Sequence, residues 1–351
     1  MKILINALSG NGDALMFSPS LRLLKEKIPD AQIDMLVMFR SVKEMYLQNP
    51  FLNKIYFIDF MKQSKFRSLA EVRTLSKNEY DFSINVYPAN RLEYNIVNAF
   101  LGAKKKIAHH YIHTNISRAE FINDILIDEI ENRHNVLQNL DLIKPIIKIE
   151  DKDAPAMDLF ISDKHSSNAK NWIAENIPEG KMLIGFHAGS SVLKNHIHKR
   201  WDKDKYSELG KILIKKYQAE ILLFGSESEL NNEIVNKIGS NVHIASTADY
   251  MDSIARMKYC SLIISNDTAF LHSAAALRIP TVGIFGYTNY KELFPWKTEY
   301  RIVRQDLVCS PCFYNSPKPA ECIWKGDDEF KCIRNIGTEE VLEAVKSLLG
   351  K

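Results

Sequence analysis

Residues 261–286 read SLIISNDTAFLHSAAALRIPTVGIFG, a strand–helix–strand unit in one continuous stretch. The apolar run Ser261–Ser265 predicts a buried strand, and the small and apolar residues of Asp267–Leu277 predict a helix. A second apolar run, Pro280–Phe285, predicts the next strand, which ends at Gly286. Two short strands separated by one helix are typical of parallel strands joined by a helical crossover.

The same alternation extends over most of the 351 residues, and no internal sequence repeat is visible. A helix is expected over Asp204–Tyr217, and the basic stretch 104–118 is expected to be a loop. Further strands are expected at Lys2–Asn6, Gln32–Met38, Lys54–Ile58, Asp81–Val86, Met182–His187 and Ala219–Phe224.

The chain is too long for one ordinary core, so we expect two domains. The alternation loosens around Pro145 and Pro155. We therefore expect an N-terminal Rossmann-like domain over 1–155, a C-terminal one over 165–335, and a final helix over 338–351 with Thr338 as its N-cap. The expected class is α/β, with two parallel-sheet domains facing a central cleft that would hold the ligands.

Composition excludes several classes of protein. Hydrophobic residues make up 46% and charged residues 25%, which is ordinary for a globular protein and excludes disorder. The net charge of +3 is too small to favour nucleic acid as a partner. The first apolar run stops at Asn6 and no stretch of about 18 apolar residues follows. We expect a cytoplasmic protein whose contact with the inner membrane, if any, is peripheral.

Three polar segments follow predicted strands. Ser9–Asp13 (SGNGD) has Leu15 where a dinucleotide fingerprint needs glycine, so Asp13 either caps a helix or faces a ligand. His187–Ser191 (HAGSS), followed by Lys199 and Arg200, suits an anion but also fits a solvated turn.

The third segment is Ser265–Thr268 (SNDT), at the start of the predicted helix of the opening stretch. Unpaired N–H groups at a helix start favour a phosphate, although Asp267 and Thr268 also suit plain helix capping. His272, one turn further, is either a ligand contact or a core histidine.

Four cysteines, Cys309, Cys312, Cys322 and Cys332, crowd into 24 residues near the C-terminus. In a cytosolic protein such a group favours a metal over disulfides. Four thiolates suit zinc or iron, and the alternative is four reduced thiols in a loop.

Taken together and in this order, the motifs resemble glycosyltransferase family 9, the heptosyltransferases. The resemblance rests on the three segments above, on Phe224-Gly225-(x)3-Glu229 and on PTVGIFGYT at 280–288. It implies a GT-B fold whose C-terminal domain holds an ADP-sugar and whose N-terminal domain holds the acceptor, with the final helix crossing back to the N-terminal domain. It also implies inversion at the anomeric carbon without a catalytic metal or other cofactor.

The resemblance implies roles for single residues. Asp13 corresponds to the general base, and Glu229 to the nucleoside contact. Lys199 would bind the diphosphate and stabilise its charge as it leaves. The other donor contacts that it implies are Ser190, Ser191, Asp267, Thr268 and His272.

Two features limit the resemblance. The family usually reads Asp-Thr-Gly-Pro where this chain has Ala269-Phe270 after Thr268, which concerns sugar specificity. Relatives that glycosylate autotransporter proteins have an iron-binding four-cysteine finger with longer spacings. The implied partners are an ADP-sugar and a lipopolysaccharide or protein acceptor, and another nucleotide sugar remains an alternative donor. A catalytically silent nucleotide-binding module is the alternative of another class.

Overall fold

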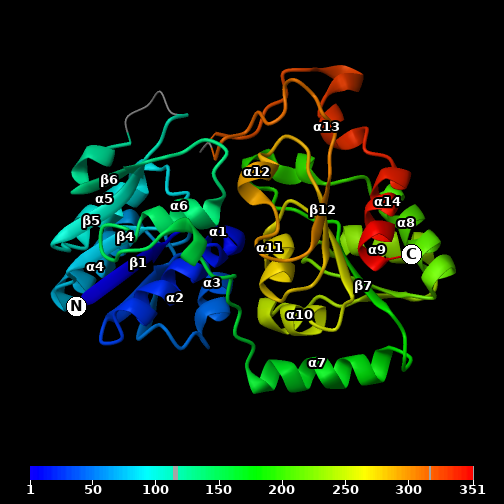
Figure 1. Cartoon of the computed structure of the whole chain (residues 1–351), viewed down its shortest axis with the longest axis horizontal. Coiled ribbons are helices and arrows are strands. Elements are labelled where there is room, and N and C mark those ends of the chain that lie inside the picture. Colours follow the sequence, from blue (N-terminus) through cyan, green and yellow to red (C-terminus); the bar gives the residue numbers. More distant parts are fainter. Residues whose placement is uncertain (114–117, 316–317, 351) are drawn as a thin grey trace. The chain divides into compact units, whose positions relative to one another are not determined.

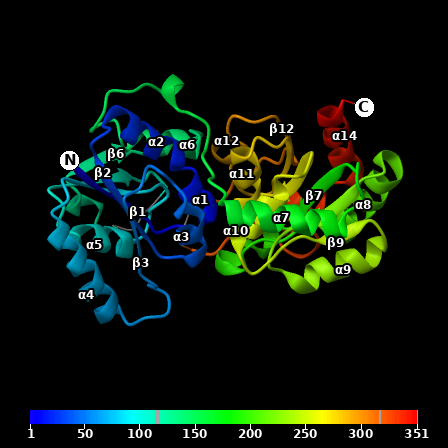
Figure 2. The same ribbon diagram turned by 90° about the horizontal axis from the view of Figure 1, so that it is seen from below.

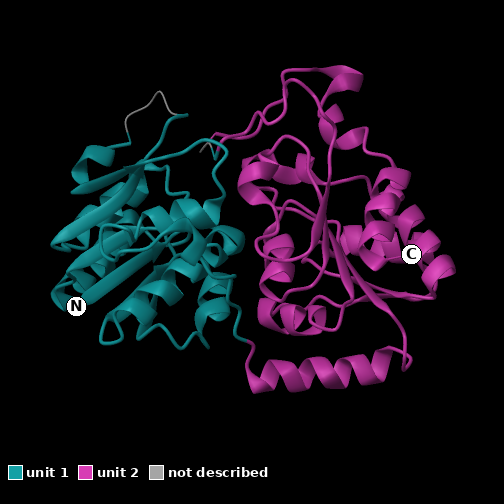
Figure 3. Cartoon of the chain, viewed as in Figure 1, with its two compact units in different colours: residues 1–160, 315–317 teal, residues 161–314, 318–351 magenta. Residues whose placement is uncertain are grey.

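The computed structural model describes residues 1–113, 118–315 and 318–350, in two compact units (Figure 3). Unit 1 comprises residues 1–160 and 315–317, and unit 2 comprises residues 161–314 and 318–351. The chain passes from one unit to the other after Phe160, which lies between the predicted limits at 155 and 165.

Unit 1 contains a six-stranded parallel sheet with the order β3-β2-β1-β4-β5-β6. In the centre, Ile5 of β1 pairs with Met35 of β2 and with Ile84 of β4. These three central strands are buried along most of their length because helices cover both faces of a parallel sheet. The strands are β1 (Lys2–Ala7), β2 (Gln32–Val37), β3 (Lys54–Phe57), β4 (Phe82–Asn85), β5 (Lys105–His110) and β6 (Ile125–Asp128).

The helices of unit 1 lie on both sides of this sheet. Figure 2 shows α2 and α6 on one side and α4 and α5 on the other. Val72 of α4 and Val97 of α5 pack in one core with Leu4 and Leu36 of the strands. The helices are α1 (Asn11–Leu15), α2 (Ser18–Lys27), α3 (Arg40–Tyr46), α4 (Lys65–Leu75), α5 (Leu92–Phe100) and α6 (Asn135–Asp141).

Unit 2 repeats the architecture, with a six-stranded parallel sheet of order β12-β11-β10-β7-β8-β9. Its strands are β7 (Leu183–His187), β8 (Glu220–Leu223), β9 (Val242–Ile244), β10 (Leu262–Asn266), β11 (Thr281–Ile284) and β12 (Tyr300–Val303). Two parallel Rossmann-like sheets in one chain confirm the predicted fold class.

Helices α8, α9 and α14 lie on one side of the sheet of unit 2, and α10 and α11 on the other (Figure 1). Helix α7, which opens the unit, packs on α10. The helices are α7 (Asp163–Asn176), α8 (Lys203–Tyr217), α9 (Ser228–Ile238), α10 (Tyr250–Met257), α11 (Ala269–Ala276), α12 (Tyr290–Leu293), α13 (Lys331–Arg334) and α14 (Thr338–Leu349).

The structure differs from the sequence predictions at the final helix. The apolar stripe of α14 packs in the core of unit 2, against α8, β11 and β12, and not on the N-terminal domain. Its side chains Val341 and Val345 are fully buried there. The N-cap is Gly337 instead of Thr338, because the Glu340 carboxylate accepts a hydrogen bond from the Gly337 N–H at 2.6 Å.

The basic stretch 104–118 also differs from its prediction. Part of it forms strand β5, which pairs with β4 and β6, and residues 114–117 lie outside the described residues. Among the described helices, none has the length and apolar character needed to cross a membrane.

Candidate functional site

In unit 2 the polar loops that the sequence singled out gather at the carboxyl ends of β7, β8 and β10. The chain continues from β7 to β8 on one side, whereas β10 pairs with β7 on the other. This change of direction is where open α/β sheets bind ligands. We call the residues described below, at this end of the sheet, the unit 2 site.

A buried ion pair lies at the centre of the unit 2 site. Nζ of Lys199, at the end of the 3-10 helix Leu193–Lys199, donates to Oδ2 of Asp267 at 2.7 Å. Only 5% of the Asp267 side chain is exposed. Burial by itself would raise the pKa of Asp267, but the Lys199 charge and hydrogen bond, together with His272 and a hydrogen bond from Thr288, hold this pKa below its ordinary value. The pair therefore keeps one positive and one negative charge under the surface.

Thr268 forms the N-cap of α11, in extended conformation and without a side-chain capping bond. Its Oγ1 lies 2.9 Å from Nδ1 of His187 and 3.3 Å from Oγ of Ser265. Burial lowers the pKa of His187 to about 3, so its ring is neutral at pH 7. The first turn of α11 thus begins beside Lys199 and Asp267, and its N-terminus is suited to an anion.

His272 lies on α11 and is 3% exposed. Burial lowers its pKa to about 4, and the charges of Asp267 and Lys199 act on it in opposite directions. Within the described part of the chain, its buried Nδ1 has no hydrogen-bond partner. A core histidine would normally have that nitrogen satisfied, so the orphaned nitrogen is consistent with the predicted ligand contact.

The two predicted serine contacts occupy different environments. Ser190 is buried, and its hydroxyl donates to the His196 carbonyl at 2.8 Å. Arg200 donates two hydrogen bonds to Ser190, from Nε to the Ser190 Oγ at 3.1 Å and from Nη2 to the Ser190 carbonyl oxygen at 2.8 Å. Ser191 is exposed. Ser190 therefore fixes the loop after β7, and Ser191 is the serine accessible to a ligand.

Two acids, Glu227 and Glu229, follow β8 and differ in burial; the sequence analysis singled out only Glu229. Glu229 is exposed in the first turn of α9. Glu227 lies two residues earlier, half-buried, 3.7 Å from Nη2 of Arg200. Its carboxylate lies so close to Gly189 that a Cβ there would overlap it, and a Cβ on Gly225 would lie 2.6 Å from its Oε2. These two glycines are the only sequence signal that marks Glu227.

Phe270, the departure from the family pattern, packs back into unit 2. Its ring stacks on His187 with centroids 4.3 Å apart, and meets Tyr250 edge-on at 5.3 Å. It is 9% exposed. The bulky side chain is therefore part of the support beneath the loop after β7.

Asp13, the predicted base, lies in unit 1 and is half-buried. It is the third residue of α1, directly after β1, and the N-cap of this helix is Gly10. Asp13 is thus not the N-cap residue. Its charge contributes to the raised pKa values of Tyr94 and Tyr111, for which burial is the main cause, so it lies near these phenols at the carboxyl end of β1.

Beneath this end of the sheet lies a network of buried asparagines that sequence reasoning missed. Nδ2 of Asn6 donates to Oδ1 of Asn98 at 2.9 Å and of Asn85 at 3.1 Å. Asn98 donates to Asn123 at 2.8 Å, and Asn85 to Asn95 at 3.2 Å. Side-chain bonds of this kind fix one arrangement of β1, β4 and α5 and so support the end of β1 from which the chain continues to α1 and Asp13.

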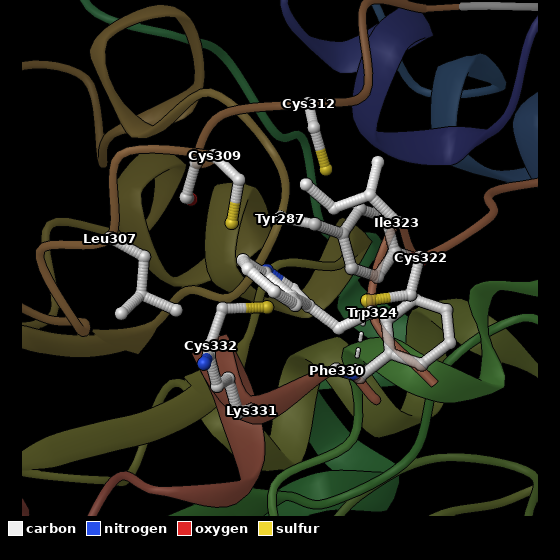
Figure 4. Close-up of a pocket in the computed structure, with 11 residues that line it drawn as sticks. Tyr287, Leu307, Cys309, Cys312, Cys322, Ile323, Trp324, Phe330, Lys331 and Cys332 are labelled. Atoms are coloured by element: carbon white, nitrogen blue, oxygen red, sulfur yellow. Dashed lines mark hydrogen bonds between the residues drawn. The ribbon is translucent and has the colours of Figure 1, made fainter. Parts of the chain in front are cut away.

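The four cysteines of the segment 309–332 line one cavity, together with Tyr287, Trp324 and Phe330. Figure 4 shows their sulfur atoms turned toward the same interior space. All four are free thiols. Burial, followed by the neighbouring thiols, raises the pKa of Cys332 to about 12, and the Phe330 N–H lies 3.2 Å from Sγ of Cys322.

The described residues contain no group of three or more His, Cys, Asp or Glu side chains arranged to hold a metal ion. The predicted zinc or iron site at the four cysteines therefore has a shared cavity but not a formed coordination sphere.

A family model and a curated relative identify the family of this chain. The model of glycosyltransferase family 9 (heptosyltransferase) matches residues 68–322. Lipooligosaccharide heptosyltransferase 2 of Campylobacter jejuni subsp. jejuni serotype O:2 is 27% identical over 358 residues, covering 99% of this chain and 98% of the relative.

Two solved structures share the fold. A glycosyl transferase family 9 protein from Veillonella parvula superposes with a TM-score of 0.78 and 16% identity, covering 99% of this chain and 97% of that one. The ADP-heptose lps heptosyltransferase II of E. coli superposes with a TM-score of 0.75 and 22% identity, covering 99% and 98%.

Proposed function

Because this chain belongs to glycosyltransferase family 9, the heptosyltransferases, we propose that it moves a heptose from ADP-heptose to a hydroxyl of inner-core lipopolysaccharide. The E. coli neighbour is named for ADP-heptose and lps, and the curated relative for heptose transfer in lipooligosaccharide. The observation that carries the proposal is the unit 2 site, where Lys199, held by Asp267, and the N-terminus of α11 place hydrogen-bond donors at the carboxyl ends of β7 and β10.

In this proposal the diphosphate binds at the start of α11. Backbone N–H groups of the first turn, Oγ1 of Thr268, the Ser191 hydroxyl and Nζ of Lys199 donate to its oxygens. Asp267 does not contact the diphosphate, because a carboxylate would repel it. It holds Lys199 in place through the 2.7 Å ion pair. Asp267 is therefore a positioning residue, which differs from the donor contact expected from the sequence.

The proposed reaction is a single displacement that inverts the anomeric carbon. The acceptor oxygen forms a bond to that carbon as the bond to the β-phosphate oxygen of ADP breaks, and the acceptor proton passes to the Asp13 carboxylate. Charge grows on the leaving diphosphate through an oxocarbenium-like state. Lys199 and the α11 N-terminus stabilise that charge, so no catalytic metal is required.

The residues of the cysteine segment lead to a separate proposal, a structural zinc or iron ion. Four thiols already line one cavity, and an N–H group points to one sulfur, as thiolate ligands require. Binding would draw the sulfur atoms together from their present positions. Such an ion would fold this segment and would take no part in sugar transfer.

Calorimetry with a panel of nucleotides tests the donor assignment. We expect ADP to bind more tightly than UDP or GDP, and ADP-heptose to be consumed only when a lipopolysaccharide core acceptor is present. Tighter binding of UDP or GDP would indicate another nucleotide sugar, and a protein acceptor that replaces the core would indicate protein glycosylation. Binding of ADP without transfer to either acceptor would indicate a silent module.

A further inference from the structure

Helix α4 of unit 1 carries an unusual concentration of exposed apolar and basic side chains. Phe66, in its first turn, is 89% exposed, and Met61, in the preceding turn, is 64% exposed. Residues 61–78 contain five basic side chains and one acid, Glu71. We define the α4 patch by its members at the surface: Met61, Lys62, Lys65, Phe66, Arg67, Arg73 and Lys77.

The core does not account for these apolar side chains. Val72 and Leu75 of α4 already pack into the core of unit 1. Phe66 and Arg73 lie seven residues apart and so share one face of the helix, turned away from that core. Exposed apolar side chains that lie together, as Phe66 and Met61 do next to cations, indicate a surface for an external partner.

The neighbouring helix extends the apolar character. Helix α5 packs on α4 and exposes Leu92, Ile96 and Phe100, which recur every four residues and form one stripe. Its other face, with Val97, is buried in the same core as Val72.

Charge identifies the partner. A protein partner of ordinary composition would not match five cations within 16 residues, whereas the surface of an anionic bilayer would. Only Arg67 of the patch is paired within this segment, with Glu71 at 3.0 Å. Exposed Phe and Met side chains with surrounding Lys and Arg are the features of a segment that lies in the membrane interface.

We propose that the α4 patch docks the protein on an anionic phospholipid bilayer, with Phe66 and Met61 inserted among the headgroups. The inference rests on the proposed function, because a lipid-linked acceptor is presented at a membrane surface. It goes further by naming the surface that makes the contact. Docking would confine the enzyme to the layer in which its acceptor is found.

Co-sedimentation with vesicles tests the proposal, using phosphatidylglycerol–phosphatidylethanolamine vesicles and, as comparison, phosphatidylcholine vesicles. We expect binding to the anionic vesicles only, weakened by salt. The apolar double variant Met61→Ser/Phe66→Ser and the charge double variant Lys65→Gln/Arg73→Gln should each lower the partition coefficient, the latter by about 30-fold.

Matched controls lie outside the patch. Leu47→Ser removes an apolar side chain of unit 1 that is 55% exposed, and Lys211→Gln/Lys215→Gln removes two exposed charges from α8. Both should bind vesicles like the unchanged protein. Equal weakening by controls and patch variants, or equal binding to both kinds of vesicle, would overturn the proposal.

Two further measurements separate docking from catalysis and from self-association. Transfer to a lipid-free core oligosaccharide should be unchanged in the patch variants, whereas transfer to vesicle-embedded acceptor should fall with the partition coefficient. If the unchanged protein transfers sugar to neither acceptor, the proposed function is wrong, whereas the vesicle-binding result still holds. A dimer in sedimentation velocity that Met61→Ser/Phe66→Ser dissolves would show that a second copy covers the patch, against the proposal.

Discussion

Replacing Lys199 tests whether the unit 2 site binds ADP. In Lys199→Ala, Asp267 loses the ammonium 2.7 Å from its Oδ2 while staying buried. Two effects follow. Breaking a buried ion pair costs about 3–5 kcal/mol of stability. Loss of a charge-assisted hydrogen bond to the diphosphate costs about 1.5–3 kcal/mol of binding, which is about 12-fold to 150-fold in Kd.

A second substitution separates the two effects. In Lys199→Ala/Asp267→Asn the buried group is neutral, so most of the lost stability should return. The affinity for ADP should not return, because the ammonium is still missing. Urea unfolding gives the stability, and calorimetry with ADP gives the affinity. If the double variant regains the affinity of the unchanged protein, the loss came from local distortion and Lys199 does not contact the diphosphate.

The sign of the pH dependence provides an independent check. With Lys199 the folded-state pKa of Asp267 lies below its ordinary value, so the pair stabilises the fold above the ordinary carboxyl pKa and loses this contribution as pH falls. Without the charge and hydrogen bond of Lys199, the folded-state pKa of Asp267 rises. The stability deficit of Lys199→Ala should therefore shrink between pH 7 and pH 4, and a deficit that stays constant would contradict a charged Asp267.

Four further results are expected. Asp13→Asn should lower turnover about 100-fold to 10,000-fold with ADP affinity unchanged, and transfer within a few-fold of normal would exclude a base role. Glu227→Gln should weaken ADP more than Glu229→Gln does in calorimetry, because Glu227 is half-buried against Gly189 at the unit 2 site whereas Glu229 is exposed; the reverse order would restore Glu229 as the nucleoside contact. Elemental analysis should find about one zinc or iron per chain, and metal-free protein with four titratable thiols would end that proposal. A buried neutral histidine such as His272 should lower the free energy of unfolding by about 1.4 kcal/mol per pH unit as pH falls from about 6.5 toward 4. His272→Asn should therefore make the free energy of urea unfolding depend less steeply on pH. An unchanged dependence on pH would show that this histidine does not titrate on unfolding.

Much of the fold could be predicted because the strands of a parallel sheet are apolar on both faces. The opening stretch 261–286 forms β10, α11 and β11 close to the expected limits. Strand β5 was missed because its sequence, KKIAHH, is polar. His109 is nevertheless buried in this strand. Its Nδ1 lies 3.1 Å from the carbonyl oxygen of Ile127, and its Nε2 lies 3.0 Å from the carbonyl oxygen of Gln138. Such hydrogen bonds are tertiary and leave no periodic pattern in the sequence.

The candidate site divides in the same way. Thr268 could be predicted as a candidate because it follows a predicted strand at a helix start, and Lys199 because the family motif marks it; their roles stay predictions. The sequence marked Arg200 but not its contacts with Ser190, and it did not mark Glu227, because these roles depend on two loops that meet only in the folded sheet. For the same reason the sequence could not show that the Ser190 hydroxyl donates a hydrogen bond to the His196 carbonyl.

The departure at Phe270 is compatible with the proposed chemistry because of where its ring goes. A proline at this position would restrict the first turn of α11 by fixing φ, whereas phenylalanine leaves the backbone freer. The stacking of Phe270 on His187 supplies a different restraint, since His187 in turn lies 2.9 Å from Oγ1 of Thr268. The ring thus steadies, through His187, the hydroxyl that would meet the diphosphate. Sugar specificity would then depend on other side chains, with His272 and its orphaned Nδ1 the first to examine.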